Sequence, residues 1–235
     1  HPLTRAEFER GSGRELEGKM KAVNSSSALV VNVFDYWRRQ DRIEAIADCC
    51  GMEGEVVGMQ FERTHRISFV GSRPHLDVEF AGSKPLAIES KFTEVYGRRA
   101  RRPVVETRLD RYLQHDALWN NLPNTKELTG RIVRESEGAT AWEHLDAPQF
   151  IKHILGLTCS YGSQFTLLYL WYRMESAEAE RHEQEVVEFS DAVGNEVDFR
   201  VMTYQTLFSR IKRVTDADSC YLDYLERRYF SEYTK

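Results

Sequence analysis

The chain has 235 residues, of which 41% are hydrophobic and 29% are charged, and its formal net charge is −5. This composition is ordinary for a soluble globular protein, and the length suits one large domain or one domain with an added subdomain. The sequence has no apolar run of the ~18 residues that a membrane-spanning helix needs. The negative net charge excludes a globally basic nucleic-acid binder, so such binding would need a local basic surface.

The chain has four cysteines, which are Cys49, Cys50, Cys159 and Cys220. They form no CxxC pair, and the two direct neighbours are poorly placed to bond with each other. Cysteines in this pattern are typical of reduced thiols in the cytoplasm. We therefore expect a cytoplasmic protein without structural disulfides.

The N-terminal part predicts one long helix behind a polar segment. Residues 1–24 are polar and mixed in charge, which is typical of a frayed helix or a disordered arm. The three serines at 25–27 then offer N-cap chemistry for a helix over residues 28–50. Its apolar residues share one helical stripe that continues after a phase slip, and Gly51 is a suitable stop.

Strands are predicted next. Residues 55–70 alternate loosely and predict a strand or a pair of strands. Residues 75–81 and 86–92 alternate between apolar and polar side chains, with turn residues between them. These two strands predict a hairpin with one polar face. The charged positions on it are Asp77, Glu79, Glu89 and Lys91.

Residues 97–146 are the least regular part of the sequence. They begin with a compact basic patch at 97–103. Residues 106–122 have a helical pattern, and residues 123–130 have the composition of a loop.

Regular elements return after this stretch. Asp146 can cap a helix over residues 147–158, and residues 165–172 predict a buried strand. Residues 175–188 are acidic and predict an exposed helix or loop. A strand and two amphipathic helices follow, at residues 197–204, 204–214 and 220–230. This order of helices and strands predicts a mixed α/β fold.

The charged face of the hairpin points to a metal site. Asp77 and Glu89 lie on neighbouring strands with matching parity, so their carboxylates can converge on one ion. Mg²⁺ commonly binds one or two protein carboxylates together with phosphate and water. Lys91, two residues beyond Glu89, can orient or activate a water or offset phosphate charge. These groups suit metal-assisted cleavage of a phosphodiester.

Asp77 followed by the sequence IESK at residues 88–91 resembles the PD-(D/E)XK nuclease superfamily, which has the restriction-endonuclease-like fold. The core of that superfamily is a helix, a three-stranded meander, a second helix and a fourth strand. The predicted elements follow this order over residues 25–172. The serines that open the first helix and the sequence TYQTLF at residues 203–208 are also similar to segments of uncharacterised bacterial members.

The resemblance implies how the chain is organised. Residues 1–24 would be a polar arm, and residues 25–172 a nuclease-like core with a helical insertion at about 97–146. Residues 173–235 would form a C-terminal extension, a strand plus helices, packed on the core.

The resemblance also implies roles for the charged residues. Asp77 and Glu89 would hold Mg²⁺, for which Mn²⁺ would substitute, and Lys91 would position the nucleophilic water. The family often has Pro before the aspartate, where this chain has Leu76, a tolerated variation.

A third, upstream acid is common in the superfamily, and the sequence leaves its identity open. Glu62 is the first choice because its strand should neighbour Asp77. Glu55 and Glu44 are the alternatives.

The second core helix carries a further similarity. Gln149 and His153 are four residues apart and share a helix face, similar to a Gln-xxx-Tyr pair of exonuclease-type members. Gln149 is thereby a candidate catalytic residue, whereas His153 could contact phosphate, contact water or have no role. Asn32 in the first helix could reach the site or form a structural hydrogen bond. The basic patch offers candidate phosphate contacts, or a solvated loop, through Arg98, Arg99, Arg101 and Arg102.

The function that these residues and the resemblance imply is a Mg²⁺-dependent deoxyribonuclease, an endonuclease of restriction, defence or repair. Its partner would be DNA and not a membrane, and a homodimer is one way to cut both strands, although no interface is evident in the sequence. Two alternatives stay open. One is a catalytically silent DNA- or protein-binding member of the same fold, and the other is a nuclease acting on RNA.

Overall fold

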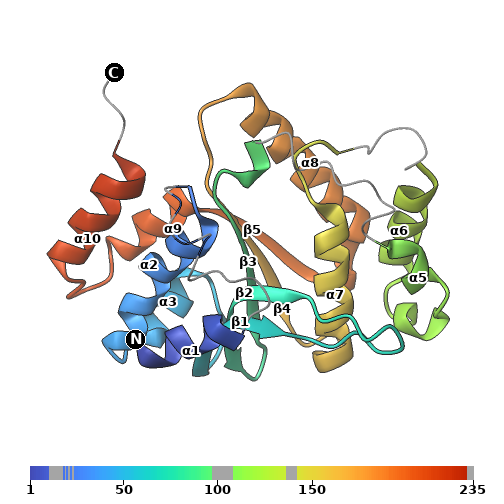
Figure 1. The fold of residues 1–235 in the computed structure, drawn as a ribbon, viewed down its shortest axis with the longest axis horizontal. Helices are drawn as coiled ribbons and strands as arrows, with labels where there is room; N and C mark the ends of the chain where they lie inside the picture. The colour runs from blue at the N-terminus through green and yellow to red at the C-terminus, as the bar shows by residue number, and fades with distance from the viewer. Residues whose placement is uncertain are drawn as a thin grey trace.

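A five-stranded sheet forms the centre of the protein (Figure 1). The computed structural model describes residues 1–10, 18, 20, 22, 24–96, 108–135 and 142–231. The longer elements are, in chain order, α1 Pro2–Arg10, α2 Ser26–Arg39, α3 Ile43–Cys49, β1 Val56–Thr64, β2 His75–Gly82, β3 Leu86–Lys91, α5 Leu109–Leu113, α6 Pro123–Glu135, α7 Ala147–Tyr161, β4 Thr166–Trp171, α8 Ala177–Val193, β5 Asp198–Thr203, α9 Tyr204–Ile211 and α10 Ser219–Leu225. Short 3-10 turns lie at Glu94–Tyr96 (η2), Asp116–Trp119 (η4) and Gly194–Glu196 (η5), and a π-helical turn at Glu226–Phe230 (η6) follows α10.

The strands follow one another across the sheet in the order β1-β2-β3-β4-β5. The first three form an antiparallel meander, and β4 and β5 add in parallel to β3. Each parallel addition requires a crossover, which α7 provides before β4 and α8 before β5. The mixed α/β fold predicted from the sequence is confirmed, with the predicted order of helix, meander, helix and strand.

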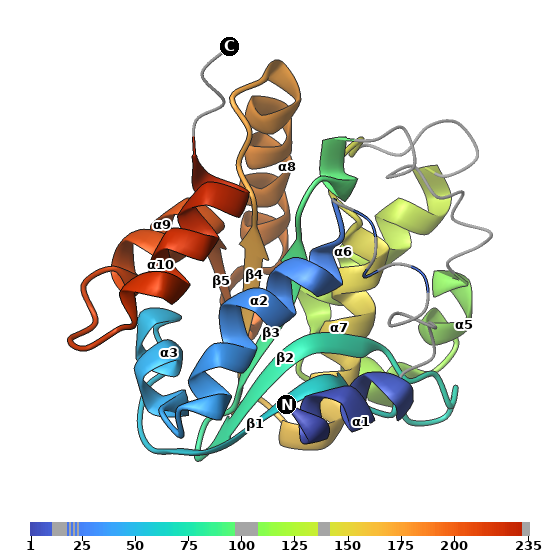
Figure 2. The same ribbon diagram turned by 60° about the vertical axis from the view of Figure 1, so that its left-hand side comes forward.

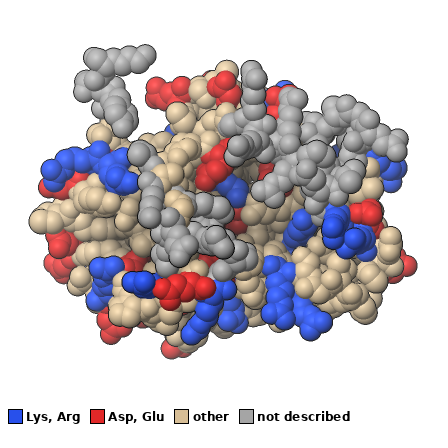
Figure 3. Space-filling model, viewed as in Figure 1, with Lys and Arg blue, Asp and Glu red and all other residues tan. Residues whose placement is uncertain are grey.

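Helices cover both faces of the sheet. Helices α2, α3, α9 and α10 lie on one side, and α5, α6, α7 and α8 lie on the other (Figures 1 and 2). Two apolar clusters fill the two interfaces, one around Phe34 and Phe80 and the other around Phe150 and Tyr169. The face of the molecule seen in Figure 3 carries acidic and basic side chains intermixed. None of the helices in the described part of the chain has the length and apolar character needed to cross a membrane.

The prediction of one long helix over residues 28–50 is wrong in one respect, because the structure has two helices in this range. Helix α2 ends at Arg39, and α3 starts at Ile43. Between them Asp41 adopts a left-handed conformation with φ of 53°, which no α-helix can accommodate. The phase slip in the apolar pattern marks this break. The Ser25 side chain caps α2 by accepting from the Ala28 amide, as expected.

Residues 123–130 were predicted as a loop but belong to helix α6. Pro123 occupies the first turn, where its missing N–H costs nothing. The Glu196 carboxylate accepts from the backbone N–H groups of Asn124 and Thr125 at 2.5 and 3.0 Å. This cap comes from a residue about seventy positions later, so the local sequence could not reveal it.

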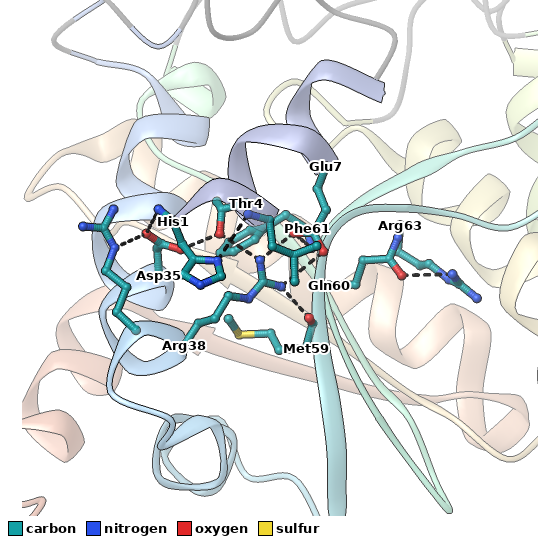
Figure 4. A network of polar contacts seen from close by, with 11 residues as sticks. His1, Thr4, Glu7, Asp35, Arg38, Met59, Gln60, Phe61 and Arg63 are labelled. Atoms are coloured by element: carbon teal, nitrogen blue, oxygen red, sulfur yellow. Dashed lines mark hydrogen bonds and ion pairs between the residues drawn. The ribbon is translucent and has the colours of Figure 1, made fainter.

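Helix α1 closes the outer edge of the sheet at β1 (Figure 4). The Glu7 carboxylate accepts from the Phe61 backbone N–H at 3.3 Å and from the Arg38 guanidinium at 2.6 Å. Arg38 also donates to the Met59 carbonyl. These side chains satisfy backbone groups that an edge strand would otherwise expose. Phe8 of the same helix is buried against Phe61.

Replacing Arg38 by alanine should lower the free energy of unfolding by about 3 kcal/mol, because it leaves the Glu7 carboxylate buried without its cation. The side chains of Arg38 and Glu7 are only 8% and 6% exposed. The matched control is Arg5→Ala, which removes an ion pair with Glu9 whose side chains are 76% and 53% exposed. Urea unfolding should show a large shift for the first variant and none for the second. Equal shifts would contradict the structural role of Arg38.

All four cysteines are free thiols, as expected. Cys49 and Cys50 are buried, and burial raises the pKa of both. These two are therefore poor nucleophiles.

Candidate active site at the ends of strands β2 and β3

Asp77 and Glu89 meet where β2 and β3 separate. The last registered pair of the two strands is Val78 with Ile88, and the next position outward has Asp77 on β2 and Glu89 on β3. Beyond that pair, the Asp77 carboxylate accepts a hydrogen bond from the Ser90 backbone N–H at 2.7 Å. The Asp77 side chain thus replaces a backbone carbonyl as the acceptor, and this hydrogen bond holds its carboxylate between the two strands.

Glu89 is buried and has two positively polarised neighbours. Its side chain is 3% exposed, its Oε1 accepts from the Lys91 ammonium, and its Oε2 lies 2.9 Å from His153 Nε2. Burial alone would raise the Glu89 pKa, but Lys91 and His153 outweigh it and lower the pKa to about 2. Glu89 is therefore ionised throughout the physiological pH range.

Lys91 is fixed by two acceptors from different elements. Besides Glu89, its Nζ donates to the Gln149 Oε1 on helix α7 at 2.9 Å. Burial would lower the Lys91 pKa, yet the charges of Glu89 and Asp77 outweigh it and raise the pKa. The side chain is consequently a permanent cation, able to donate hydrogen bonds and to offset negative charge, but not to accept a proton.

Asp77 differs from Glu89 in its proton affinity. Burial and the negative charge of Glu89 raise the Asp77 pKa well above its usual value, against the opposing effects of Lys91 and of the Ser90 N–H. Two carboxylates held close together cannot both ionise freely. A cation bound between them would therefore favour the state in which both carboxyls are ionised.

Glu62 lies on β1 across from Asp77, because its neighbours Phe61 and Arg63 pair with Val78 and Leu76. Its charge contributes to the raised Asp77 pKa, and its Oε2 is 3.5 Å from His75 Nδ1. Its φ of 52° is left-handed, which is rare for a non-glycine residue inside a strand and is often found at functional sites.

Helix α7 is oriented toward the site by capping at its start. The Asp146 side chain accepts from the Gln149 backbone N–H, as the sequence predicts. The loop before it is held by Glu185 of α8, whose carboxylate accepts three backbone N–H groups, those of residues 143, 144 and 145, at 2.7 to 2.9 Å. Glu185 lies in the acidic stretch expected to be exposed, yet it is 1% exposed. Its burial fixes Gln149 opposite Lys91.

Two other candidates make contacts with different parts of the protein. Asn32 donates to the Tyr229 hydroxyl at 2.7 Å, a structural hydrogen bond to the C-terminal helices. Glu79 belongs to a separate buried network, in which it contacts His65 Nε2 at 2.6 Å and accepts from the Tyr161 hydroxyl at 2.8 Å. The candidate phosphate contacts Arg98, Arg99, Arg101 and Arg102 lie outside the described residues.

His153 is enclosed behind the carboxylates. It is 1% exposed, and its Nδ1 has no hydrogen-bond partner among the described residues. Its Nε2 contact with Glu89 falls outside good hydrogen-bond geometry. The His153 side chain is therefore buried beside Glu89, and its role toward a substrate stays a prediction.

The donor set fits a hard divalent cation. Within the described ranges, no three His, Cys, Asp or Glu side chains are grouped to hold a metal ion. Asp77 and Glu89 supply two carboxylates, which is within the number that Mg²⁺ commonly takes from a protein. Burial and the charge of Glu89 raise the Asp77 pKa, and such a cation would offset both effects.

One comparison with known proteins gives a match. A family described as "restriction endonuclease associating with ARP" matches the chain over residues 3–230. Among curated proteins and among solved structures, none gives a significant match.

Proposed function

Because the chain belongs to the family of restriction endonucleases associating with ARP, we propose that it is a metal-dependent nuclease that hydrolyses phosphodiester bonds in DNA. The observation that carries the proposal is the convergence of Asp77, Glu89 and Lys91 where β2 and β3 separate. The family supports a nuclease-type role. Metal dependence and the choice of DNA are our inference from the site.

Asp77 and Glu89 would hold Mg²⁺ or Mn²⁺, and the charge of Glu62, which lies across from Asp77 on β1, would add to the attraction for the ion. When bound, such an ion polarises a phosphoryl oxygen and lowers the pKa of a bound water. Asp77 must give up its proton to bind the ion, and its raised pKa makes that step dependent on pH. Glu89 is already ionised and needs no such change.

The Lys91 ammonium would orient the attacking water or neutralise charge that builds up on the phosphate in the transition state. It does so as a fixed cation, because the contacts with Glu89 and Gln149 leave little freedom to its side chain. Gln149 is a positioning residue that acts through Lys91. A phosphodiester would thus meet carboxylates and an ammonium that lie next to each other.

The test compares three substrates under three metal conditions. The purified protein is incubated with supercoiled plasmid, single-stranded DNA and RNA, each with Mg²⁺, Mn²⁺ or EDTA. We expect cleavage of DNA with either metal and none with EDTA. Cleavage of RNA alone would assign the activity to RNA. Failure to cleave any substrate, together with no Mn²⁺ binding in calorimetry at millimolar ion, would indicate a catalytically silent member.

A further inference from the structure

The loop between β1 and β2 exposes an aromatic ring in a strained backbone conformation. Phe69 is 68% exposed and has a φ of 65°. A left-handed conformation is unfavourable for a bulky residue, and an exposed phenyl ring gains nothing from burial. The loop is nevertheless held in place, since Ile67 is fully buried and its N–H donates to the Ser72 carbonyl at 2.8 Å. Strain kept at an exposed position points to a role in binding.

The Phe69 ring is paired with an imidazole from a distant part of the chain. It stacks on His115 with ring centroids 5.4 Å apart and an interplanar angle of 14°. His115 immediately precedes η4, so two separate elements present their rings side by side. The stack leaves most of Phe69 open to solvent and forms an aromatic platform.

The chain segment that carries Phe69 is rich in arginine. Residues 63–75 contain Arg63, Arg66 and Arg73 and no acidic residue, in a chain whose net charge is −5. All three arginines are exposed, and Arg66 and Arg73 form no ion pair with any described residue. Basic side chains are prominent at the lower right of Figure 3, where the β1–β2 connection and α5 lie.

The same loop leads directly into the candidate active site. It follows Thr64, two residues after Glu62 in β1, and it precedes His75, which is two residues before Asp77 in β2. A polyanion lying along this end of the two strands would contact the arginines and reach the carboxylates. Only two residues of each strand therefore separate the loop from Glu62 and Asp77.

We propose that Phe69 and His115 form a stacking platform for an unpaired DNA base, with Arg66 and Arg73 contacting the adjoining phosphates. This inference rests on the proposed function, because the DNA would be the polymer cut at Asp77 and Glu89. Base–aromatic stacking tolerates any sequence, and arginine neutralises the backbone without reading bases. The basic loop that carries Phe69 favours a nucleic acid over an apolar protein partner.

The test uses Phe69→Asn, because asparagine tolerates the left-handed conformation but has no ring to stack. Binding is measured by fluorescence anisotropy with EDTA, so that no DNA is cut. The probes are a fully paired duplex and the same duplex with a three-base bubble containing 2-aminopurine. We expect Phe69→Asn to bind the bubble about 10-fold more weakly than the wild-type protein, with an unchanged salt dependence and no loss of thermal stability. Phe69→Tyr should bind like the wild type.

The control is Val57→Ala, which removes an equally exposed apolar side chain (69%) from the opposite end of β1 and should not alter binding. Equal affinity of Phe69→Asn and the wild type for the bubble would overturn the platform, and so would a wild-type protein that binds neither DNA at low salt. Binding that depends on Phe69 in a protein that cuts nothing would uphold the platform and refute the proposed nuclease activity. The two proposals can therefore fail separately.

Discussion

Replacing Lys91 by methionine should lower the single-turnover rate of DNA cleavage by about 1,000-fold, the size of effect seen when a preorganised charge stabiliser is removed. Methionine keeps most of the side-chain volume but has no charge and no donor for water or phosphate. Hydrogen bonds to Glu89 and Gln149 hold the Lys91 ammonium in place at the site. The rate is measured at saturating Mg²⁺ with enzyme in excess.

Two further variants separate the role of Lys91 from a general effect of lost charge. Gln149→Ala removes only the acceptor that holds the ammonium and should cost about 10-fold, since positioning contributes less than the charge itself. Lys84→Met is the matched control, because Lys84 lies just before the other end of β3 and pairs with Asp198 at 2.5 Å. It should cleave normally. A folded Lys91→Met protein that cleaves within ten-fold of the wild type would remove Lys91 from the mechanism.

Asp77→Asn and Glu89→Gln should both abolish cleavage but change stability in opposite directions. Ionised Glu89 stabilises the fold, because its pKa of about 2 lies below the usual value of 4.5. A difference of that size corresponds to about 3 kcal/mol, so Glu89→Gln should unfold more easily by that order. Asp77→Asn removes a carboxyl whose pKa is raised by burial and by the charge of Glu89, and it should therefore stabilise the protein at pH 7.

The pH dependence has opposite signs for the two acids. The stability that Glu89 contributes is present above pH 4.5 and is lost as the pH falls toward about 2. The folded protein holds the Asp77 proton more tightly than the unfolded chain does, so ionising Asp77 costs stability as the pH rises above the usual carboxyl pKa. Urea unfolding measured over a range of pH should therefore show that the wild type loses this part of its stability as the pH rises above about 3.8, and that Asp77→Asn does not.

Thermal unfolding with and without Mn²⁺ tests whether Asp77 and Glu89 bind a metal ion. An ion bound by the folded state alone raises the melting temperature. Mn²⁺ should therefore stabilise the wild type and neither variant. Glu79→Gln is the control, since this buried acid contacts His65 and Tyr161 and should keep the full Mn²⁺ shift. A Mn²⁺ shift retained by both Asp77→Asn and Glu89→Gln would rule out this metal site.

The strands and their order were predictable because their signals are local. The alternation of β2 and β3, with a turn between them, is a period-2 pattern that the chain carries without reference to other elements. The cap of α7 by Asp146 is local in the same way. Where the predictions failed, the cause was a distant or strained residue: the Glu196 cap that makes α6 a helix, and the left-handed Asp41 that divides α2 from α3.

The sequence by itself determined which chemistry is present: two acids and a lysine at matching positions of a hairpin, and a glutamine on the following helix. Only the tertiary structure decided which of these side chains are charged and which groups they contact. The hydrogen bond of Lys91 to Gln149 joins residues 58 positions apart, and Glu185 orients that helix from a segment that appeared exposed. Periodic patterns fix the face on which a side chain lies. Its charge and its partners depend on burial among elements that meet only when the whole sheet has assembled.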